Sequence, residues 1–298
     1  ESESRGLGDV YKRQAMKFSS CTLAQLYRRI KPDGSVLGGP MVYLEEGLKE
    51  KGLPNLGKFL AILFAFLCIL ASFGGGNMFQ GNQMGQLIGE SLYGANPPAY
   101  FGPIIGIILA ILVALVIIGG IKRIASLTSK MVPAMCLFYS VICLIIIFAN
   151  FAAVPAMFAN IFNEAFNSSA IWGGFLGVLV QGMKRAAFSN EAGLGSAAIA
   201  HAAAKTDEPV REGIVASLGP FIDTIIVCTM TALALLITNS HTIEGLQGVS
   251  MTAHAFGTLA SWLPYALTIC VIVFAYSTMI SWSSVSYTHL RAHETRIH

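Results

Sequence analysis

The sequence predicts an all-α protein that crosses a membrane several times, and three observations lead to this fold class. Hydrophobic residues make up 54% of the 298 positions, and the mean hydropathy is +0.65. Only 12% of the residues are charged, about half the share that is typical of a soluble domain. Apolar runs of about 20 residues recur along the chain, each long enough to cross a hydrocarbon core of about 30 Å as a helix.

Six spans are expected from these runs, and prolines fall at or near several of their ends, as is typical of helix boundaries. In chain order the predicted spans are 58–77, 101–120, 132–152, 171–204, 215–238 and 262–282. Residues 153–166 form an apolar, amphipathic stretch that is too short to cross, and we expect it to lie along the outer surface.

The two ends of the chain differ in composition from its body. Residues 1–14 and 284–298 are polar and charged, and LGDVYKRQ and SVSYTHLRAHET look like translated adapter or vector sequence. We therefore expect both tails to be non-native and to pack against nothing. The membrane core is predicted to be residues 15–283, an internal piece of a longer protein.

Loop charge predicts how the spans are oriented. The segments 78–100, 149–171 and 239–261 contain no Lys or Arg, whereas the alternate loops contain basic residues such as Lys130, Lys205 and Arg211. Basic loops stay on the cytoplasmic side. The three segments without Lys or Arg are therefore predicted to face the outside, and the alternation is consistent along all six spans.

The fourth span is interrupted in its middle. Lys184 and Arg185 end an apolar run of about 13 residues, and FSNEAGLG follows at 188–195 before the chain becomes Ala-rich. This order is typical of a discontinuous transmembrane helix, whose freed backbone groups need partners in a cavity. A short helix, an Asx-turn and a second helix in a soluble protein would give a similar pattern, but the other spans argue against it.

A second polar stretch, GGNMFQGNQ, occupies residues 75–83. If the helix of the first span continues, Asn77 and Gln80 share one face and could point into a cavity. The alternative is a hydrated extracellular loop. The glycines at 74–76 are consistent with close helix packing or with a simple helix end, and the residues alone do not separate these two interpretations.

Few side chains could carry chemistry. The sequence contains no nucleotide-binding loop, zinc-protease pair or nucleophile elbow, so an enzyme is not predicted. The six cysteines lack paired spacing and are interpreted as small core residues. Glu191 and Asp223 are carboxylates within predicted spans, where an ion needs a partner. Glu191 is interpreted as a cap or a ligand contact, and Asp223 as a structural partner of Lys184 or Arg185 or as a gating group.

Three motifs give the chain a resemblance to a known family: GGNMFQGNQ at 75–83, FSNEAGLGSAAIAHAAAKTDEPVREG at 188–213 and LGPFIDTIIVCTMTAL at 218–233. They resemble the alanine or glycine:cation symporter family, also called the sodium:alanine symporter family. The resemblance implies a partial LeuT-type fold of inverted repeats. In that fold this chain would supply the third to fifth helices of the first repeat and the first three of the second.

The resemblance also implies a function, which is sodium-coupled symport of a small neutral amino acid, alanine or glycine, across the plasma (inner) membrane of a prokaryote. A cation channel or a transporter of other substrates is the alternative. Sodium would be co-transported, with Ser277 and Thr278 as ligands, although hydroxyls in membrane helices usually bond their own backbone. Membrane lipid is an expected partner, and nucleic acid is not. The implied substrate contacts are Asn77, Phe79, Gln80, Phe188, Ser189, Asn190, Gly193 and Trp282.

Overall fold

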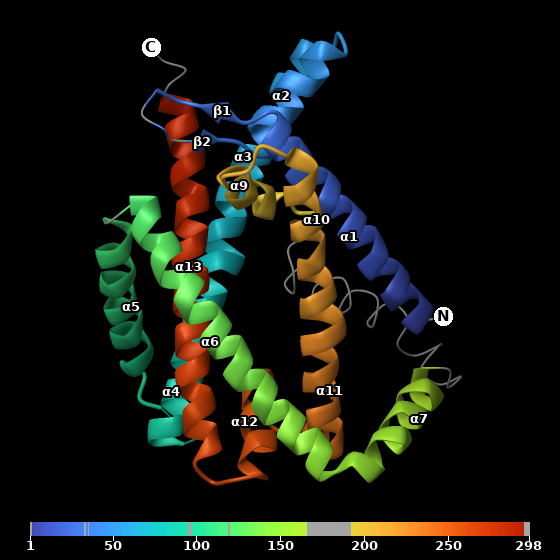
Figure 1. Ribbon diagram of the computed structural model, residues 1–298. Helices are drawn as coiled ribbons and strands as arrows, with labels where there is room; N and C mark the ends of the chain where they lie inside the picture. Colours follow the sequence, from blue (N-terminus) through green and yellow to red (C-terminus); the bar gives the residue numbers. More distant parts are fainter. Residues whose placement is uncertain are drawn as a thin grey trace. The chain divides into compact units, whose positions relative to one another are not determined.

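The computed structural model describes residues 2–294 except 33, 35, 95, 96, 119 and 166–191. This part of the chain is almost entirely helical (Figure 1). The only strands described are two short ones, β1 (Arg29–Ile30) and β2 (Val36–Leu37), which pair in antiparallel fashion. The chain divides into two compact units: unit 1 is Glu1–Ala71, Glu164–Val227 and Val285–His298, and unit 2 is Ser72–Asn163 and Cys228–Ser284.

Unit 1 contains the two strands and a set of helices. Its helices are α1 (Ser2–Leu26), α2 (Pro40–Glu50), α3 (Pro54–Ala71), α9 (Ser196–Ala202), α10 (Pro209–Pro220) and the π-helical η3 (Phe221–Val227). Unit 2 contains the π-helical η1 (Ser72–Met78), α4 (Phe79–Tyr93), α5 (Phe101–Ile117), α6 (Gly120–Ala149), η2 (Phe151–Ala153), most of α7 (Val154–Ala165), α11 (Cys228–Ile237), η4 (Ser240–Thr242), α12 (Val249–Gly257) and most of α13 (Leu263–Glu294).

Helices of membrane-spanning length confirm the coarse fold class predicted from composition. Four described stretches are long and apolar enough to cross a membrane, namely Pro54–Tyr93, Ser129–Ala149, Pro209–Ile237 and Leu263–Ser283, and α5 is a shorter apolar helix. These five correspond to five of the six predicted spans. The first part of the broken span, up to residue 191, lies outside the described residues, and α9 is the helix that follows the predicted break.

The first span is longer than predicted. Instead of ending near residue 77, the helix passes through the glycines as one π-helical segment and continues to Tyr93. The interpretation of residues 74–76 as a helix end is therefore wrong, and so is that of residues 77–83 as a loop. A second π-helical segment, η3, contains Asp223. Such wide turns leave the regular ladder of backbone hydrogen bonds and occur often at functional sites.

The core of unit 1 is built from small side chains. Helix α1 packs along α9 and α10, and the buried residues at this junction are Cys21, Ala24, Ala198, Ala202 and Ala216. Small residues allow the three helix backbones to come close together. Helix α1 runs without interruption past residue 14, and the Gln14 amide donates a hydrogen bond of 3.3 Å to the Ser217 carbonyl. The expectation that residues 1–14 contact nothing is thus wrong for Gln14.

The core of unit 2 joins helices that are distant in the sequence. One buried cluster consists of Ile142, Cys143, Ile146, Ala234, Phe256, Leu263 and Leu267, from α6, α11, α12 and α13. The Tyr139 hydroxyl, from α6, lies 2.8 Å from the Thr231 hydroxyl of α11. All six cysteines are free thiols. Cys21, Cys68 and Cys143 are buried, which confirms that these three are core residues, whereas Cys136 and Cys228 are exposed, so the prediction is wrong for these two.

Candidate functional site

The π-helical segment η1 packs against α13 through a glycine and a tryptophan. A Cβ atom added to Gly76 would lie 2.5 Å from Cγ and 2.8 Å from Cβ of Trp282, which is closer than any side chain could lie. Gly76 therefore lets the indole ring of Trp282 rest directly on the helix backbone. The structure brings Trp282 next to the segment that contains Asn77, so two of the predicted substrate contacts belong to neighbouring elements of unit 2.

Asn77 is tied to its own helix. Its Nδ2 atom donates a hydrogen bond of 2.7 Å to the carbonyl oxygen of Ser72, and Ser72 is buried. The amide thus satisfies a carbonyl group within the wide π turn, where the regular bonding pattern is interrupted. Gln80 is half-buried and Phe79 is 45% exposed. Asn77 therefore has a structural role, and the substrate contacts of all three residues stay predictions.

Ser277 and Thr278, the predicted sodium ligands, lie on α13. Both hydroxyls donate to the carbonyl oxygen of Phe274, at 2.9 Å and 3.0 Å. This is the backbone bonding that hydroxyls commonly make in helices. A hydroxyl that donates its proton keeps lone pairs that can accept, so the geometry is compatible with a cation. Ser277 is buried and Thr278 is half-buried.

The turn before α9 depends on two glycines. Gly193 has φ +90° and Gly195, the N-cap of α9, has φ +83°, a region that L-residues with side chains rarely adopt. Gly195 also packs closely against Pro40 and Phe64, from α2 and α3. The described part of the predicted helix break is therefore an irregular turn. The other predicted contacts here, Phe188, Ser189 and Asn190, lie outside the described residues, as does Glu191.

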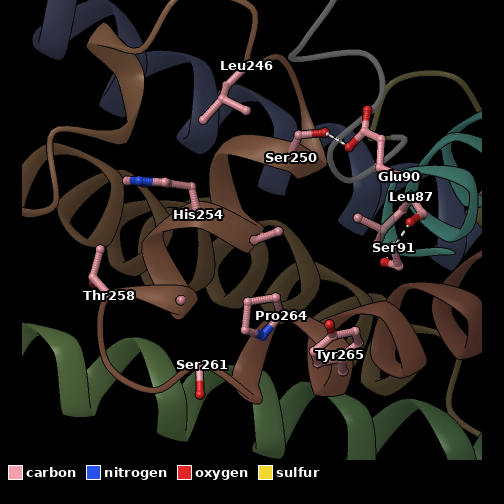
Figure 2. A pocket seen from close by; sticks show the side chains of 12 residues that line it. Leu87, Glu90, Ser91, Leu246, Ser250, His254, Thr258, Ser261, Pro264 and Tyr265 are labelled. Carbon is pink, nitrogen blue, oxygen red and sulfur yellow. Dashed lines mark hydrogen bonds between the residues drawn. The ribbon is translucent and has the colours of Figure 1, made fainter. Parts of the chain in front are cut away.

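A cavity of about 660 Å³ lies in unit 2 between α4, α12 and the start of α13 (Figure 2). Glu90 is the carboxylate in its lining, and both carboxylate oxygens accept hydrogen bonds. The Ser250 hydroxyl donates at 2.5 Å and the Gln86 amide at 2.9 Å. His254 also lines the cavity, with its Nδ1 2.9 Å from the Ser240 hydroxyl. The volume is sufficient for a small ligand.

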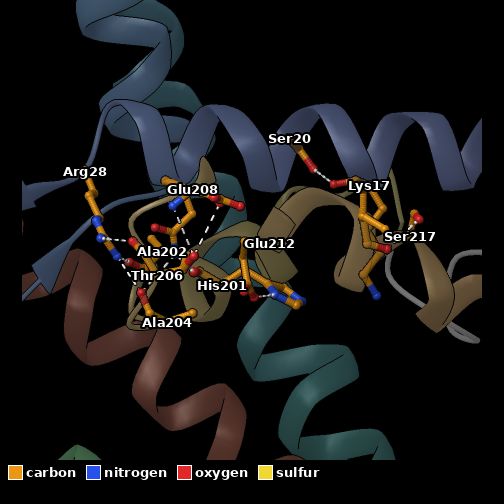
Figure 3. A network of polar contacts seen from close by, with 12 residues as sticks. Lys17, Ser20, Arg28, His201, Ala202, Ala204, Thr206, Glu208, Glu212 and Ser217 are labelled. Atoms are coloured by element: carbon orange, nitrogen blue, oxygen red, sulfur yellow. Dashed lines mark hydrogen bonds and ion pairs between the residues drawn. The ribbon is translucent and has the colours of Figure 1, made fainter. Parts of the chain in front are cut away.

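None of the predicted binding residues that the structure describes lines this cavity. Sequence reasoning missed Glu90, although one signal was available, because it is the single charged residue in the segment 78–100. Sequence reasoning also assigned no role to Arg28, whose guanidinium donates to carbonyl groups after α9. The Nδ1 atom of His201 lies 2.5 Å from a carboxylate oxygen of Glu212 (Figure 3).

The long apolar helices described above suit a multi-pass membrane protein. The family model described as the sodium:alanine symporter family matches residues 13–295, and the chain belongs to this family. It is 43% identical over 273 residues to the sodium/alanine symporter AgcS of Methanococcus maripaludis. The aligned region covers 90% of this chain and 58% of the relative. The resemblance inferred from the three motifs is confirmed.

Other relatives have related names. The chain is 35% identical over 269 residues to the probable sodium/glutamine symporter GlnT of Bacillus subtilis, covering 89% of this chain and 53% of the relative. It is also 35% identical over 268 residues to the amino-acid carrier protein AlsT of the same species, covering 89% and 54%. The chain therefore spans little more than half the length of these curated relatives.

Proposed function

We propose that the chain forms the central part of a sodium-coupled symporter for a small neutral amino acid, alanine or glycine, in the plasma membrane of a prokaryote. Membership of the sodium:alanine symporter family carries this proposal. The four long apolar helices support it, since they suit a multi-pass membrane protein.

The proposed architecture is the LeuT-type inverted repeat. In this arrangement the stretches Pro54–Tyr93, Phe101–Ile117 and Ser129–Ala149 belong to the first repeat, and α9, Pro209–Ile237 and α13 belong to the second. Two observations support the assignment. An irregular turn at Gly193–Gly195 directly precedes α9. The wide turns of η1 and η3 interrupt the regular helix of the stretches Pro54–Tyr93 and Pro209–Ile237.

The proposed chemistry uses neutral oxygen and amide groups. The hydroxyl oxygens of Ser277 and Thr278 would coordinate sodium, a hard cation that prefers oxygen ligands. Backbone amides at the predicted helix break would bind the carboxylate of the amino acid, as helix N-termini commonly bind anions. Asn77 and Gln80 would accept hydrogen bonds from an ammonium group. Trp282 and Phe79 are large side chains that would restrict the substrate to a small one.

The sodium gradient supplies the work. A membrane potential of ~100 mV is worth ~2.3 kcal/mol for each charge that crosses. A tenfold sodium ratio adds ~1.4 kcal/mol. One sodium ion moving inward with each amino acid therefore supports an accumulation of roughly 500-fold.

The test is uptake of labelled alanine into proteoliposomes with an inward sodium gradient. Residues 15–283 would replace the matching part of the Methanococcus maripaludis relative, and the resulting chimera is compared with the chain alone. We expect the chimera to accumulate alanine above its outside concentration only when the sodium gradient is present. The chain alone should not, because it spans 58% of that relative. Alanine flux that only follows its own gradient would contradict symport and favour a channel.

A further inference from the structure

The end of α9 is held by an arginine from the segment that follows α1 (Figure 3). One guanidinium nitrogen of Arg28 donates to the carbonyl oxygens of Ala202 and Ala204, at 3.2 Å and 2.5 Å. The other donates to the carbonyl of Thr206 at 2.8 Å. The last carbonyl groups of a helix have no partner within the helix and carry partial negative charge. A single arginine thus caps the end of α9 and the turn that follows it.

Gln25, one helical turn earlier on α1, donates to the same region. Its Nε2 atom donates to the carbonyl groups of His201 and Ala204. The two carbonyl acceptors fix the orientation of the amide, because a flipped amide would place its oxygen against theirs. In this orientation the Gln25 Oε1 atom is buried and accepts no hydrogen bond from any described residue. A buried acceptor without a donor is energetically costly.

Helix α9 has little stability of its own. It is seven residues long, which is far below the ~12–15 residues at which an isolated helix becomes marginally stable in water. Its position therefore depends on its neighbours. Close packing of Gly38 against Ala202 and of Gly39 against Ile199 holds one side, and Gln25 and Arg28 hold the C-terminal end by hydrogen bonds.

We propose that Gln25 and Arg28 are positioning residues that hold α9 in a closed arrangement, and that their release from the carbonyl groups of residues 201–206 lets α9 move during transport. This inference rests on the proposed function. Helix α9 follows the predicted break, and its C-terminal end leads into the loop of Lys205 and Arg211, which loop charge assigns to the cytoplasmic side. Opening would let water reach Gln25 Oε1, so part of the cost of breaking the hydrogen bonds is recovered.

Cys21 provides a native reporter of this movement. Its side chain is fully buried against Ala198 and Ala202 of α9 and Ala216 of α10, so N-ethylmaleimide can reach the thiol only when α1 separates from these helices. The experiment uses the chimera with every cysteine except Cys21 replaced. Arg28→Met keeps the length of the side chain and removes all its donors, and Gln25→Met does the same for the amide.

The matched control is Arg29→Met. Arg29 is the next residue and also an arginine, but it pairs with Glu46 of α2 instead of with α9. We expect Arg28→Met to raise the alkylation rate of Cys21 roughly tenfold or more, Gln25→Met to raise it less, and Arg29→Met to leave it unchanged. Adding alanine and sodium should change the alkylation rate of Cys21 in the parent chimera, but it should not change that rate in the Arg28→Met variant.

Two results would overturn the proposal. One is an equal Cys21 rate in Arg28→Met and Arg29→Met. The other is an equal rise of the alkylation rate on Arg28→Met in a chimera whose single cysteine is Cys143, which is fully buried in the core of unit 2. That rise would show that Arg28 stabilises the whole protein instead of α9. A parent chimera without alanine uptake contradicts the proposed function, whereas the alkylation comparison still decides whether Arg28 holds α9.

Discussion

Replacing Gly76 by alanine should destabilise the packing of η1 against α13. The new Cβ atom would lie 2.5 Å from Cγ, 2.8 Å from Cβ and 2.8 Å from Cδ2 of Trp282. These atoms are at the root of the side chain, so the indole cannot move away without shifting the backbone. Overpacking of this kind costs about 1–3 kcal/mol. Alanine recovers up to ~1 kcal/mol through its higher helix propensity, which leaves a net loss of about 0–2 kcal/mol.

Gly74→Ala is the matched control, because it lies in the same π-helical segment and a Cβ atom there would meet nothing within 4 Å. It should be neutral or stabilising by up to ~1 kcal/mol. Thermal unfolding in detergent measures the difference, with each kcal/mol shifting the midpoint by roughly 2–4 °C. In the background of Trp282→Ala, Gly76→Ala should lose most of its effect. A Gly76→Ala protein as stable as Gly74→Ala would refute the contact.

Three further predictions concern orientation, sodium and pH. Cysteines placed at Leu92 and Gln247 should react with an impermeant thiol reagent from outside and one at Lys130 should not; the reverse pattern would overturn the orientation. Thr278→Val should raise the sodium concentration for half-maximal alanine uptake by the chimera several-fold, because it keeps the shape and removes one oxygen ligand; unchanged sodium dependence would exclude this residue from the site. Burial raises the pKa of the Cys21 thiol from 9.0 to about 11. The stability that the neutral thiol contributes is therefore complete below pH 9 and is lost as the pH rises to about 11, by at most ~3 kcal/mol, and Cys21→Ala should flatten this decline in thermal unfolding.

Apolar runs were sufficient to predict five of the six spans, because a helix in lipid must satisfy its own backbone groups and must be long enough to cross. The prediction failed where the cause was distant in the sequence. The first span was predicted to end near residue 77, and the glycines at 74–76 were compatible with a helix end or with close packing, yet the helix continues to Tyr93. Gly76 packs against Trp282, and no pattern within the first span shows that a side chain more than 200 residues away lies there.

The same limit applies to the candidate site. Sequence reasoning identified Asn77 as a polar residue on a membrane helix. Such a residue can bind a ligand or its own backbone, and the sequence pattern is the same in both cases. The structure shows the second role, a hydrogen bond to the Ser72 carbonyl. Arg28 was missed for a related reason. Its acceptors at residues 202–206 come from another part of the chain, and a basic residue near a helix end is usually a solvated one.

Polar side chains at the predicted binding residues have hydrogen-bond partners, whereas some at the α1–α9 junction do not. Asn77, Ser277 and Thr278 each donate to a nearby carbonyl group of their own helix, so these residues carry little cost before any ligand arrives. Among the described residues, the buried side-chain atoms without a hydrogen-bond partner are Thr22 Oγ1 and Gln25 Oε1, both on α1. Unsatisfied buried groups are rare in folded proteins, and each calls for an explanation. Both atoms lie where α1 meets α9 and α10, the contact that a movement of α9 would break.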